Sequence, residues 1–378
     1  MEKVLRVEDF SLEVEINGRA YTAVDGIHFH VNEGEILGIV GESGCGKSLT
    51  ALAVQGLLAP NVCVKSGRML FGGEDLLAMP AARRREINGR DITMIFQEPM
   101  TSLNPLMKVG RQIGEVLALH SRLDRKEIHR RSAELLEEIG IYDVERILAS
   151  YPHQLSGGMR QRVMIAMAVI CSPRLLIADE PTTALDVTTQ AHVLALLKKI
   201  NREHGTSMLF ISHDIGVISS LCDRMLVMYG GKIMEKGCTQ DVLGQPVHEY
   251  TKGLLNSIPT REKKGAPLNC IPGRVPPVTE QKPPCPFAPR CPAAQEICSR
   301  QAPAETPLGG AHAASCWNIG AGAGASGGNP FGISGGNPFG ISGGDSFGIS
   351  GGNSFGISGG SSVGTSGVSS AEVSGGEA

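Results

Sequence analysis

Eight consecutive residues near the N-terminus have the spacing of a phosphate-binding loop. Segment 41–48 fits the pattern Gly-x-x-x-x-Gly-Lys-Ser/Thr at every fixed position. Glycines let backbone N–H groups close around phosphate oxygens, and a helix that starts at the loop adds partial positive charge. We expect the Lys47 ammonium to reach the β- and γ-phosphates and the Ser48 hydroxyl to ligate Mg²⁺. The expected nucleotide contacts are Gly41, Glu42, Ser43, Gly44, Cys45, Gly46, Lys47, Ser48 and Leu49.

A chance match in an ordinary turn is the alternative interpretation of this segment, called the phosphate loop below. The local context argues against it. An apolar run at 35–40 predicts a strand before the loop, and the pattern at 49–58 predicts a helix after it. A strand followed by the loop and a helix is the arrangement that phosphate binding requires.

A second apolar run, at 175–178, ends in two adjacent carboxylates, Asp179 and Glu180. Parallel strands present ligands at their carboxyl ends, so both acids are expected beside the phosphates. Asp179 would hold Mg²⁺ through water, and Glu180 would polarise the water that attacks the γ-phosphate. Alone, such a pair is typical of a solvated strand end, and the phosphate loop is what favours the catalytic interpretation.

A second glycine turn lies far along the chain from the first. Leu155-Ser156-Gly157-Gly158 precedes a predicted helix at 159–170, whose exposed N-terminal amides would form another anion site. Such a turn alone is often only a helix cap. A second phosphate-binding surface is useful if it serves ATP held by another subunit.

Together these segments resemble the ATP-binding-cassette (ABC) family, in which segment 155–158 matches the signature motif. In that family two domains sandwich two ATP molecules, each between the phosphate loop of one and the signature of the other. Gln97 resembles the Q-loop glutamine, Ala184-Leu185-Asp186 the D-loop and His213 the switch histidine. Singly, each has an ordinary surface or capping role, and the joint order over residues 34–237 favours the family.

The resemblance implies three groups of functional residues. The catalytic residues would be Glu180, His213 and Gln97. Further nucleotide contacts would come from Gln97, Ser156, Gly157, Gly158 and Asp186. The Mg²⁺ ligands would be Ser48, Gln97 and Asp179.

The sequence departs from the family at the aromatic residue that stacks on adenine. The comparable stretch, 14–18, contains no aromatic side chain. Tyr21 and Phe10 are the alternatives for this platform, and weaker base selectivity is an expected consequence.

Within the ABC family the chain resembles dipeptide/oligopeptide/nickel importers. The similar segments are 94–105, 159–168, 248–255, where Glu249 replaces a proline, and 271–273, where that family's C-terminal extension begins. The resemblance covers about residues 1–317. It implies two integral-membrane permease subunits, a companion ABC ATPase or second copy, and an extracytoplasmic solute-binding protein as partners. ATP would close the dimer and hydrolysis would reopen it, which energises peptide import.

Four of the ten cysteines gather near the end of the chain: Cys285, Cys291, Cys298 and Cys316. Four thiolates suit Zn²⁺ or an iron–sulfur cluster. Zinc ribbons favour shorter Cys-x₂₋₄-Cys pairs, and the family extension can carry a [4Fe–4S] cluster. Zinc and free thiols remain alternatives.

These residues need a scaffold that places strand ends side by side. Apolar runs at 91–96, 175–178, 208–212 and 225–229 alternate with helical patterns at 125–140 and 188–204. This alternation predicts an α/β fold with a mostly parallel core sheet and helices on both faces. Alternating stretches at 12–16 and 27–31 predict antiparallel strands. The resemblance implies an antiparallel β subdomain and a helical subdomain at about 97–155.

Three parts are expected along the chain. Residues 1–260 would form the ABC ATPase cassette, and residues 261–320 a Cys/Pro-rich extension that does not join the sheet. Residues 321–378 contain a Gly/Ser octapeptide repeat that cannot build a core and is expected to be disordered. A weakly self-associating tail is the alternative.

Composition limits the function classes. A net charge of −3 gives no strongly basic surface for nucleic acid. The sequence contains no run of about 18 apolar residues and no signal-peptide pattern, so we expect a cytoplasmic chain that does not span a bilayer alone. The resemblance to importers implies that it is peripheral on the cytoplasmic face of the inner membrane. Alternatives are an importer for nickel or another small solute, a soluble non-transport ABC ATPase, and a nucleotide-dependent redox sensor.

Overall fold

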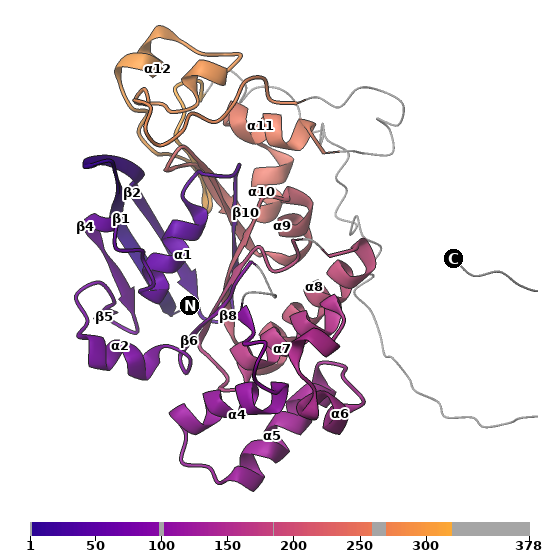
Figure 1. Cartoon of the computed structure of the whole chain (residues 1–378). Helices are drawn as coiled ribbons and strands as arrows, with labels where there is room; N and C mark the ends of the chain where they lie inside the picture. Colours follow the sequence, from indigo (N-terminus) through magenta and orange to yellow (C-terminus); the bar gives the residue numbers. More distant parts are fainter. Residues whose placement is uncertain (1, 98–101, 184, 259–269, 320–378) are drawn as a thin grey trace, which may run out of the picture. The chain divides into compact units, whose positions relative to one another are not determined.

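The computed structural model describes residues 2–97, 102–183, 185–258 and 270–319, which all belong to one compact unit (Figure 1). Segment 98–101 beside Gln97, Ala184 of the expected D-loop, residues 259–269 and the repeat tail lie outside the described residues. The expectation of a disordered tail is therefore untested.

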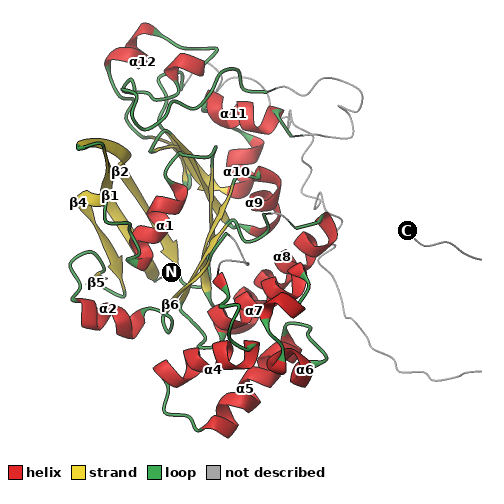
Figure 2. Ribbon diagram, viewed as in Figure 1, coloured by secondary structure: helices red, strands yellow, loops and turns green. Residues whose placement is uncertain are grey.

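A mixed sheet of eight strands carries the phosphate loop and both acids (Figure 2). Its order is β11-β12-β10-β9-β3-β8-β7-β6, and the five strands from β9 to β6 are parallel. The strands are β3 (Ile36–Val40), β6 (Ile92–Ile95), β7 (Leu175–Asp179), β8 (Ser207–Ser212), β9 (Arg224–Tyr229), β10 (Lys232–Cys238), β11 (Thr306–Gly309) and β12 (His312–Ala314). The predicted parallel core is confirmed.

A separate four-stranded antiparallel sheet has the order β2-β1-β4-β5. Its strands are β1 (Lys3–Ile16), β2 (Arg19–Asn32), β4 (Val62–Phe71) and β5 (Glu74–Asp75). Asn17 and Gly18, with φ of 52° and 74°, form the two-residue turn between β1 and β2. Two consecutive positive φ angles suit the tight hairpin turn for which Asn-Gly is favoured. The predicted early antiparallel strands are thus confirmed, and they extend further than the sequence indicated.

Helices flank the sheets and form a separate group at α4–α6 (Figure 1). The α-helices are α1 (Lys47–Gln55), α2 (Ala81–Ile87), α4 (Val109–His120), α5 (Arg125–Glu138), α6 (Val144–Ala149), α7 (Gly157–Val169), α8 (Val187–His204), α9 (Ile215–Leu221), α10 (Thr239–Gly244), α11 (Glu249–Asn256) and α12 (Glu296–Arg300). Within the described ranges the short 3₁₀ helices are η1 (Pro152–Gln154) and η3 (Ala288–Arg290). Helices α4, α5 and α6 fall inside the segment expected to be the helical subdomain, whose boundaries remain a prediction.

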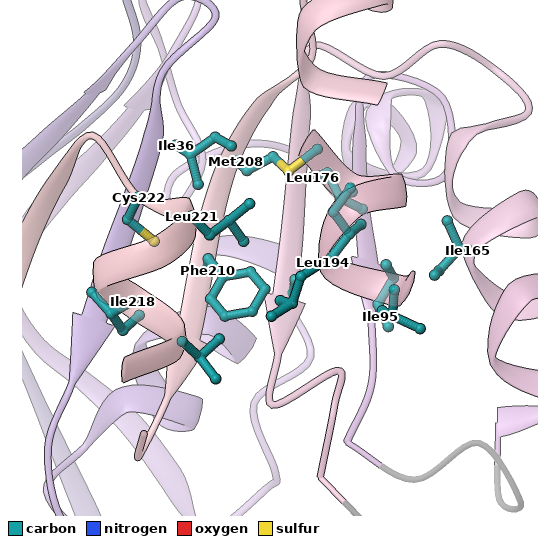
Figure 3. Close-up of a cluster of buried hydrophobic side chains, with 14 of the residues drawn as sticks. Ile36, Ile95, Ile165, Leu176, Leu194, Met208, Phe210, Ile218, Leu221 and Cys222 are labelled. Atoms are coloured by element: carbon teal, nitrogen blue, oxygen red, sulfur yellow. The ribbon is translucent and has the colours of Figure 1, made fainter. Parts of the chain in front are cut away.

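Each face of the parallel sheet is buried in its own apolar core. In β3, Ile36 and Val40 belong to one core, and Leu37 and Ile39 to the other. The first core lies under α7, α8 and α9 and includes Phe210 and Leu176 (Figure 3). The second lies between α1 and the antiparallel sheet. Strands buried on both faces explain why the sequence shows continuous apolar runs there.

The C-terminal extension corrects one expectation, because part of it joins the sheet. Strand β12 pairs antiparallel with β10, and β11 pairs with β12. The fully buried Glu235 of β10 accepts a hydrogen bond from Nε2 of His312 at 2.8 Å, which fastens β12 in place. Strands of four and three residues, with Pro307 in the outer one, are too short to produce a readable alternation.

Candidate functional site

The phosphate loop connects β3 to α1, and its glycines are required by its geometry. Gly44 and Gly46 have φ of 81° and 104°, a region that side chains rarely allow. A Cβ atom on Gly41 would lie 2.2 Å from the backbone oxygen of Met228. The loop therefore approaches the neighbouring strand more closely than any other residue type permits.

Lys47 begins α1 and is only 5% exposed. Its Nζ donates to the backbone oxygens of Gly41 at 2.7 Å and Glu42 at 3.1 Å. These bonds hold the ammonium within the loop, where a phosphate would be met. Burial raises the pKa of the Cys45 thiol, although the nearby Lys47 opposes the shift, so Cys45 adds no negative charge to the loop.

A hydrogen bond joins the phosphate loop to the acidic end of β7. Ser48 Oγ donates to Oδ1 of Asp179, the last residue of β7, at 3.1 Å. Burial raises the pKa of Asp179, while the Ser48 hydroxyl opposes the shift. A hydroxyl from the first turn of α1 and a carboxylate from the end of β7 form an oxygen-rich pair of the kind that Mg²⁺ binds.

Three side chains converge on one carboxylate oxygen of Glu180. Oε2 lies 3.1 Å from Nε2 of Gln97, 3.0 Å from Oγ1 of Thr183 and 3.2 Å from Nδ1 of His213. Gln97, Glu180 and His213 follow β6, β7 and β8, which are adjacent parallel strands, so their side chains meet at one sheet edge. Three of the residues predicted to be catalytic are therefore neighbours in space.

Glu180 also has an unusual backbone. Its φ of 47° is left-handed, which is costly for a residue with a Cβ atom and is found most often at functional sites. Its N–H donates to the backbone oxygen of Ile211 in β8 at 2.9 Å, which holds this conformation. Thr183 was not predicted from the sequence, since nothing in its local pattern indicates that it faces Glu180.

The second glycine turn caps α7. Ser156 Oγ accepts the N–H of Met159 at 3.3 Å, while a Cβ on Gly157 would meet nothing within 4 Å. In the part of the chain that the structure describes, no hydrogen bond joins Ser156, Gly157 or Gly158 to the phosphate loop. Ser156 and Gly157 are exposed and Gly158 is half-buried, so the start of α7 is open to solvent, and its role as a second phosphate surface stays a prediction.

Two other contacts fix the surroundings of this turn. Gln161 of α7, buried at 1% exposure, donates from Nε2 to the backbone oxygen of Pro181 at 2.6 Å, which couples α7 to the segment after Glu180. Asp186 caps α8 by accepting from N and Oγ1 of Thr189, and these bonds lower its pKa. Gln161 was missed because a buried glutamine within a helix has no distinctive spacing.

The two candidates for the adenine platform differ in accessibility. Phe10 is fully buried in the core and offers no face to a ligand. Tyr21 is half-buried and lies directly opposite Val14 across the β1–β2 pair. An aromatic side chain is therefore available beside the position where the comparable stretch lacks one.

The four clustered cysteines lie in the C-terminal extension. Cys285 and Cys298 are buried, Cys291 and Cys316 are half-buried, and the Cys285 N–H donates to the Cys298 carbonyl at 3.1 Å. Burial raises the pKa of the Cys291 thiol to about 11, and the neighbouring thiols add to the shift. Among the described residues, no three of these sulfurs lie within 4.8 Å of one another. Tetrahedral Zn²⁺ would bring sulfurs to about 3.8 Å.

None of the helices in the described part of the chain combines the length and the apolar character needed to cross a bilayer.

Comparison with known proteins finds matching families over most of the chain. The model of the ABC transporter family matches residues 24–183, and that of the oligopeptide/dipeptide transporter C-terminal region matches residues 234–298. The dipeptide transport ATP-binding protein DppD of Bacillus subtilis is 47% identical over 84% of this chain and 95% of that relative. The oligopeptide transport ATP-binding protein OppD of Salmonella typhimurium is 47% identical over 80% of this chain and 90% of that relative.

Solved structures with the same fold include two components of ABC transporters. The dimeric, post-hydrolysis ATP-binding cassette MJ0796 with ADP and Pi superposes with a TM-score of 0.56 at 26% identity, over 62% of this chain and 98% of the cassette. The protein cbiO1 from Clostridium perfringens, part of an ABC transporter complex, gives 0.56 at 28% identity, over 65% and 92%.

Proposed function

The chain belongs to the family of ATP-binding subunits of dipeptide and oligopeptide ABC transporters, and on that premise we propose that its ATP hydrolysis energises the import of peptides. It is an ABC-type ATPase with the α/β cassette fold. The observation that carries the catalytic part of the proposal is the convergence of Gln97, His213 and Thr183 on Oε2 of Glu180.

Each residue of the site has a distinct task in this proposal. Glu180 accepts a proton from the attacking water, and His213 and Gln97 orient that carboxylate and hydrogen-bond the γ-phosphate side of the substrate. The backbone amides of the phosphate loop and the Lys47 ammonium bind the β- and γ-phosphates. No covalent intermediate is needed, because phosphoryl transfer to water depends on positioning and charge stabilisation.

The oxygen atoms of Ser48 and Asp179 fit a divalent cation, since they already lie 3.1 Å apart, one in the first turn of α1 and the other at the end of β7. We infer that these two residues, with Gln97 nearby, hold Mg²⁺ when ATP is bound. Held by these residues, a cation would supply charge neutralisation for the phosphates.

We propose that the site is completed by a second cassette, either a second copy or a companion subunit. Its support is that Ser156, Gly157 and Gly158 present an open helix N-terminus with no hydrogen bond to this chain's own phosphate loop among the described residues. MJ0796, which matches in fold, is a dimer. Asp186, which caps α8 near the signature helix, would contact the partner.

The remaining partners follow from the family. We propose that two membrane permease subunits bind the cassette, that an extracytoplasmic solute-binding protein acts through that complex, and that the chain is peripheral on the cytoplasmic face of the membrane. The support is that DppD and OppD are transport ATP-binding proteins, which match this chain over 95% and 90% of their own lengths.

For the four cysteines we propose a [4Fe–4S] cluster held by Cys285, Cys291, Cys298 and Cys316. The support is that four thiols lie in one small segment, two of them buried, and that four thiolates are the ligand set of such a cluster. Such a cluster would crosslink the segment. Anaerobic purification with iron and sulfide analysis tests this: Cys298→Ser should lose the iron and exposed Cys63→Ser should keep it. Stoichiometric zinc or metal-free thiols in the wild-type chain would overturn it.

Peptide transport is tested in proteoliposomes that carry the complete transporter. ATP supplied on the side of this chain should drive uptake of a labelled dipeptide, and Lys47→Ala should abolish it. Lys65→Ala is the control, because Lys65 is a half-exposed lysine in the antiparallel sheet. Nickel uptake without dipeptide uptake would favour the small-solute alternative instead.

A further inference from the structure

Arg290 of the C-terminal extension reaches across 248 positions of sequence to the phosphate loop. Its Nη1 lies 2.5 Å from Oε2 of Glu42, and its Nη2 lies 3.2 Å from Oε1. Two parallel bonds between a guanidinium and a carboxylate form a bidentate pair, which fixes orientation as well as distance. Glu42 is the second residue of the phosphate loop.

All five N–H groups of Arg290 have acceptors. Besides the two bonds to Glu42, Nη1 donates to the hydroxyl of Tyr229 at 3.2 Å. Nε donates to the carbonyl of Pro272 at 2.9 Å, and Nη2 to that of Ile271 at 3.2 Å. The Arg290 side chain is only 7% exposed. Because every N–H group of Arg290 has an acceptor and its side chain is shielded from solvent, the contact differs from an ordinary ion pair at the surface.

The loop is held at the same residue from a second direction. The Glu42 N–H donates to the hydroxyl of Tyr250, a fully buried residue of α11, at 2.8 Å. The rings of Tyr229, Tyr250 and Phe287 pack at centroid distances of 4.7 to 5.3 Å. Phe287 and Arg290 belong to the segment between Cys285 and Cys291. The extension and the phosphate loop therefore share one packed cluster.

The charge of Glu42 explains why such a bridge matters for binding. A carboxylate in the phosphate loop repels a triphosphate, and the repulsion grows where water is scarce. Arg290 neutralises Glu42 and also restrains the loop backbone at this point, where the carbonyls of Gly41 and Glu42 accept hydrogen bonds from the Lys47 ammonium. The pair is partly buried, with the Glu42 side chain 27% exposed, so removing Arg290 leaves the Glu42 charge poorly compensated beside the phosphates.

We propose that Arg290 is a positioning residue for the ATP site: through its bidentate bond to Glu42, the cysteine-bearing extension neutralises and orients the phosphate loop. The extension thus contributes to nucleotide affinity without touching the nucleotide. This proposal rests on the proposed binding of ATP by the phosphate loop. In addition, it assigns to the C-terminal extension an effect on the affinity for ATP.

The test is the dissociation constant for Mg-ATP of the full-length chain, together with KM and kcat for ATP hydrolysis. Arg290→Ala should weaken ATP binding at least ~10-fold, within the usual range of coupling between sites, and raise KM more than it lowers kcat. Arg290→Gln, which stays polar but uncharged, should weaken ATP binding to a similar extent. It replaces the alanine variant in the test if that variant folds poorly. Arg274→Ala is the matched control, because Arg274 lies in the same extension and its side chain is 83% exposed.

A second substitution gives the sharpest discrimination. Combining Arg290→Ala with Glu42→Gln removes the unpaired carboxylate and should recover most of the lost affinity, which a merely destabilised extension would not do. Trp317, the single tryptophan of the chain, reports by its fluorescence whether the extension stays folded. Unchanged ATP affinity in Arg290→Ala, or additive losses in the double variant, would overturn the proposal. Failure of the wild-type chain to bind ATP would instead overturn the proposed function.

Discussion

Nδ1 of His213 lies 3.2 Å from Oε2 of Glu180, although the two residues follow different strands and are 33 positions apart in sequence. The His213 side chain is 55% exposed, whereas Glu180 is only 12% exposed. The carboxylate is thus sheltered and the imidazole faces outward, which suits a histidine that meets the substrate while orienting the base.

Replacing His213 with alanine should reduce kcat for ATP hydrolysis by about 100-fold or more, the range for lost proton-transfer or orienting groups. ATP affinity should change much less, since the phosphate loop is intact. The control is His129→Ala: His129 is also 55% exposed and pairs with a glutamate, Glu145, at 3.4 Å, but in the helical group. Equal rates for both variants would remove His213 from the mechanism.

Gly41 is predicted to tolerate no side chain. Because its Cβ would lie 2.2 Å from the Met228 oxygen and 2.8 Å from Cys45 Sγ, Gly41→Ala must displace the loop or the strand. We expect ATP binding to weaken more than ~10-fold, as measured by calorimetry. Gly244→Ala, where the added atom meets nothing within 4 Å, should bind ATP normally. ATP binding by Gly41→Ala at wild-type affinity would contradict the prediction and show that the loop can accommodate a side chain here.

Tyr21 is predicted to stack on adenine. Tyr21→Ala should weaken ATP binding by about 1–3 kcal/mol, the usual contribution of an aromatic ring beneath a base, and Tyr21→Phe should keep it. Tyr142→Ala, at an 89% exposed tyrosine, is the control. ATP affinity that is unchanged in Tyr21→Ala would argue that adenine lies elsewhere.

Burial lowers the pKa of His248 to about 4, with Glu235 and Glu249 opposing the shift and Lys252 adding to it. In the unfolded chain His248 is protonated as the pH falls below about 6.5, whereas in the folded chain it is protonated only near pH 4. Stability from this residue is complete above pH 6.5 and is lost as the pH falls towards 4, by up to about 3 kcal/mol.

Denaturant unfolding between pH 4 and 7 checks this prediction. His248 Nδ1 accepts the Tyr250 N–H at 3.1 Å and caps α11, so His248→Asn retains an acceptor without the titration. Its stability should depend less on pH than that of the wild type, and His129→Asn should match the wild type. An identical pH slope for His248→Asn would refute the prediction.

The sequence was informative where function depends on local pattern. Asp179 and Glu180 could be placed beside the phosphate loop because they end an apolar strand, and parallel strands end at one edge. Gln97 and His213 were identified only through the resemblance to the family, and the structure brings both to Glu180. The phosphate loop was equally readable, because its glycines are demanded by local geometry.

The unpredicted features depend on contacts between distant segments. The Arg290–Glu42 bridge and the Gln161–Pro181 bond join residues that no spacing rule connects. The extension's strands were missed because β11 and β12 are short and follow a proline-rich stretch. For such elements tertiary pairing, not local preference, decides the structure.

The central claim is that Glu180 is the base of an ATP-hydrolysing site, and single-turnover cleavage of bound ATP by Glu180→Gln in the assembled transporter tests it most directly. The account predicts that cleavage slows by about 100-fold or more while ATP stays bound, with Glu145→Gln as the unaffected control. Cleavage by Glu180→Gln at close to the wild-type rate would contradict it.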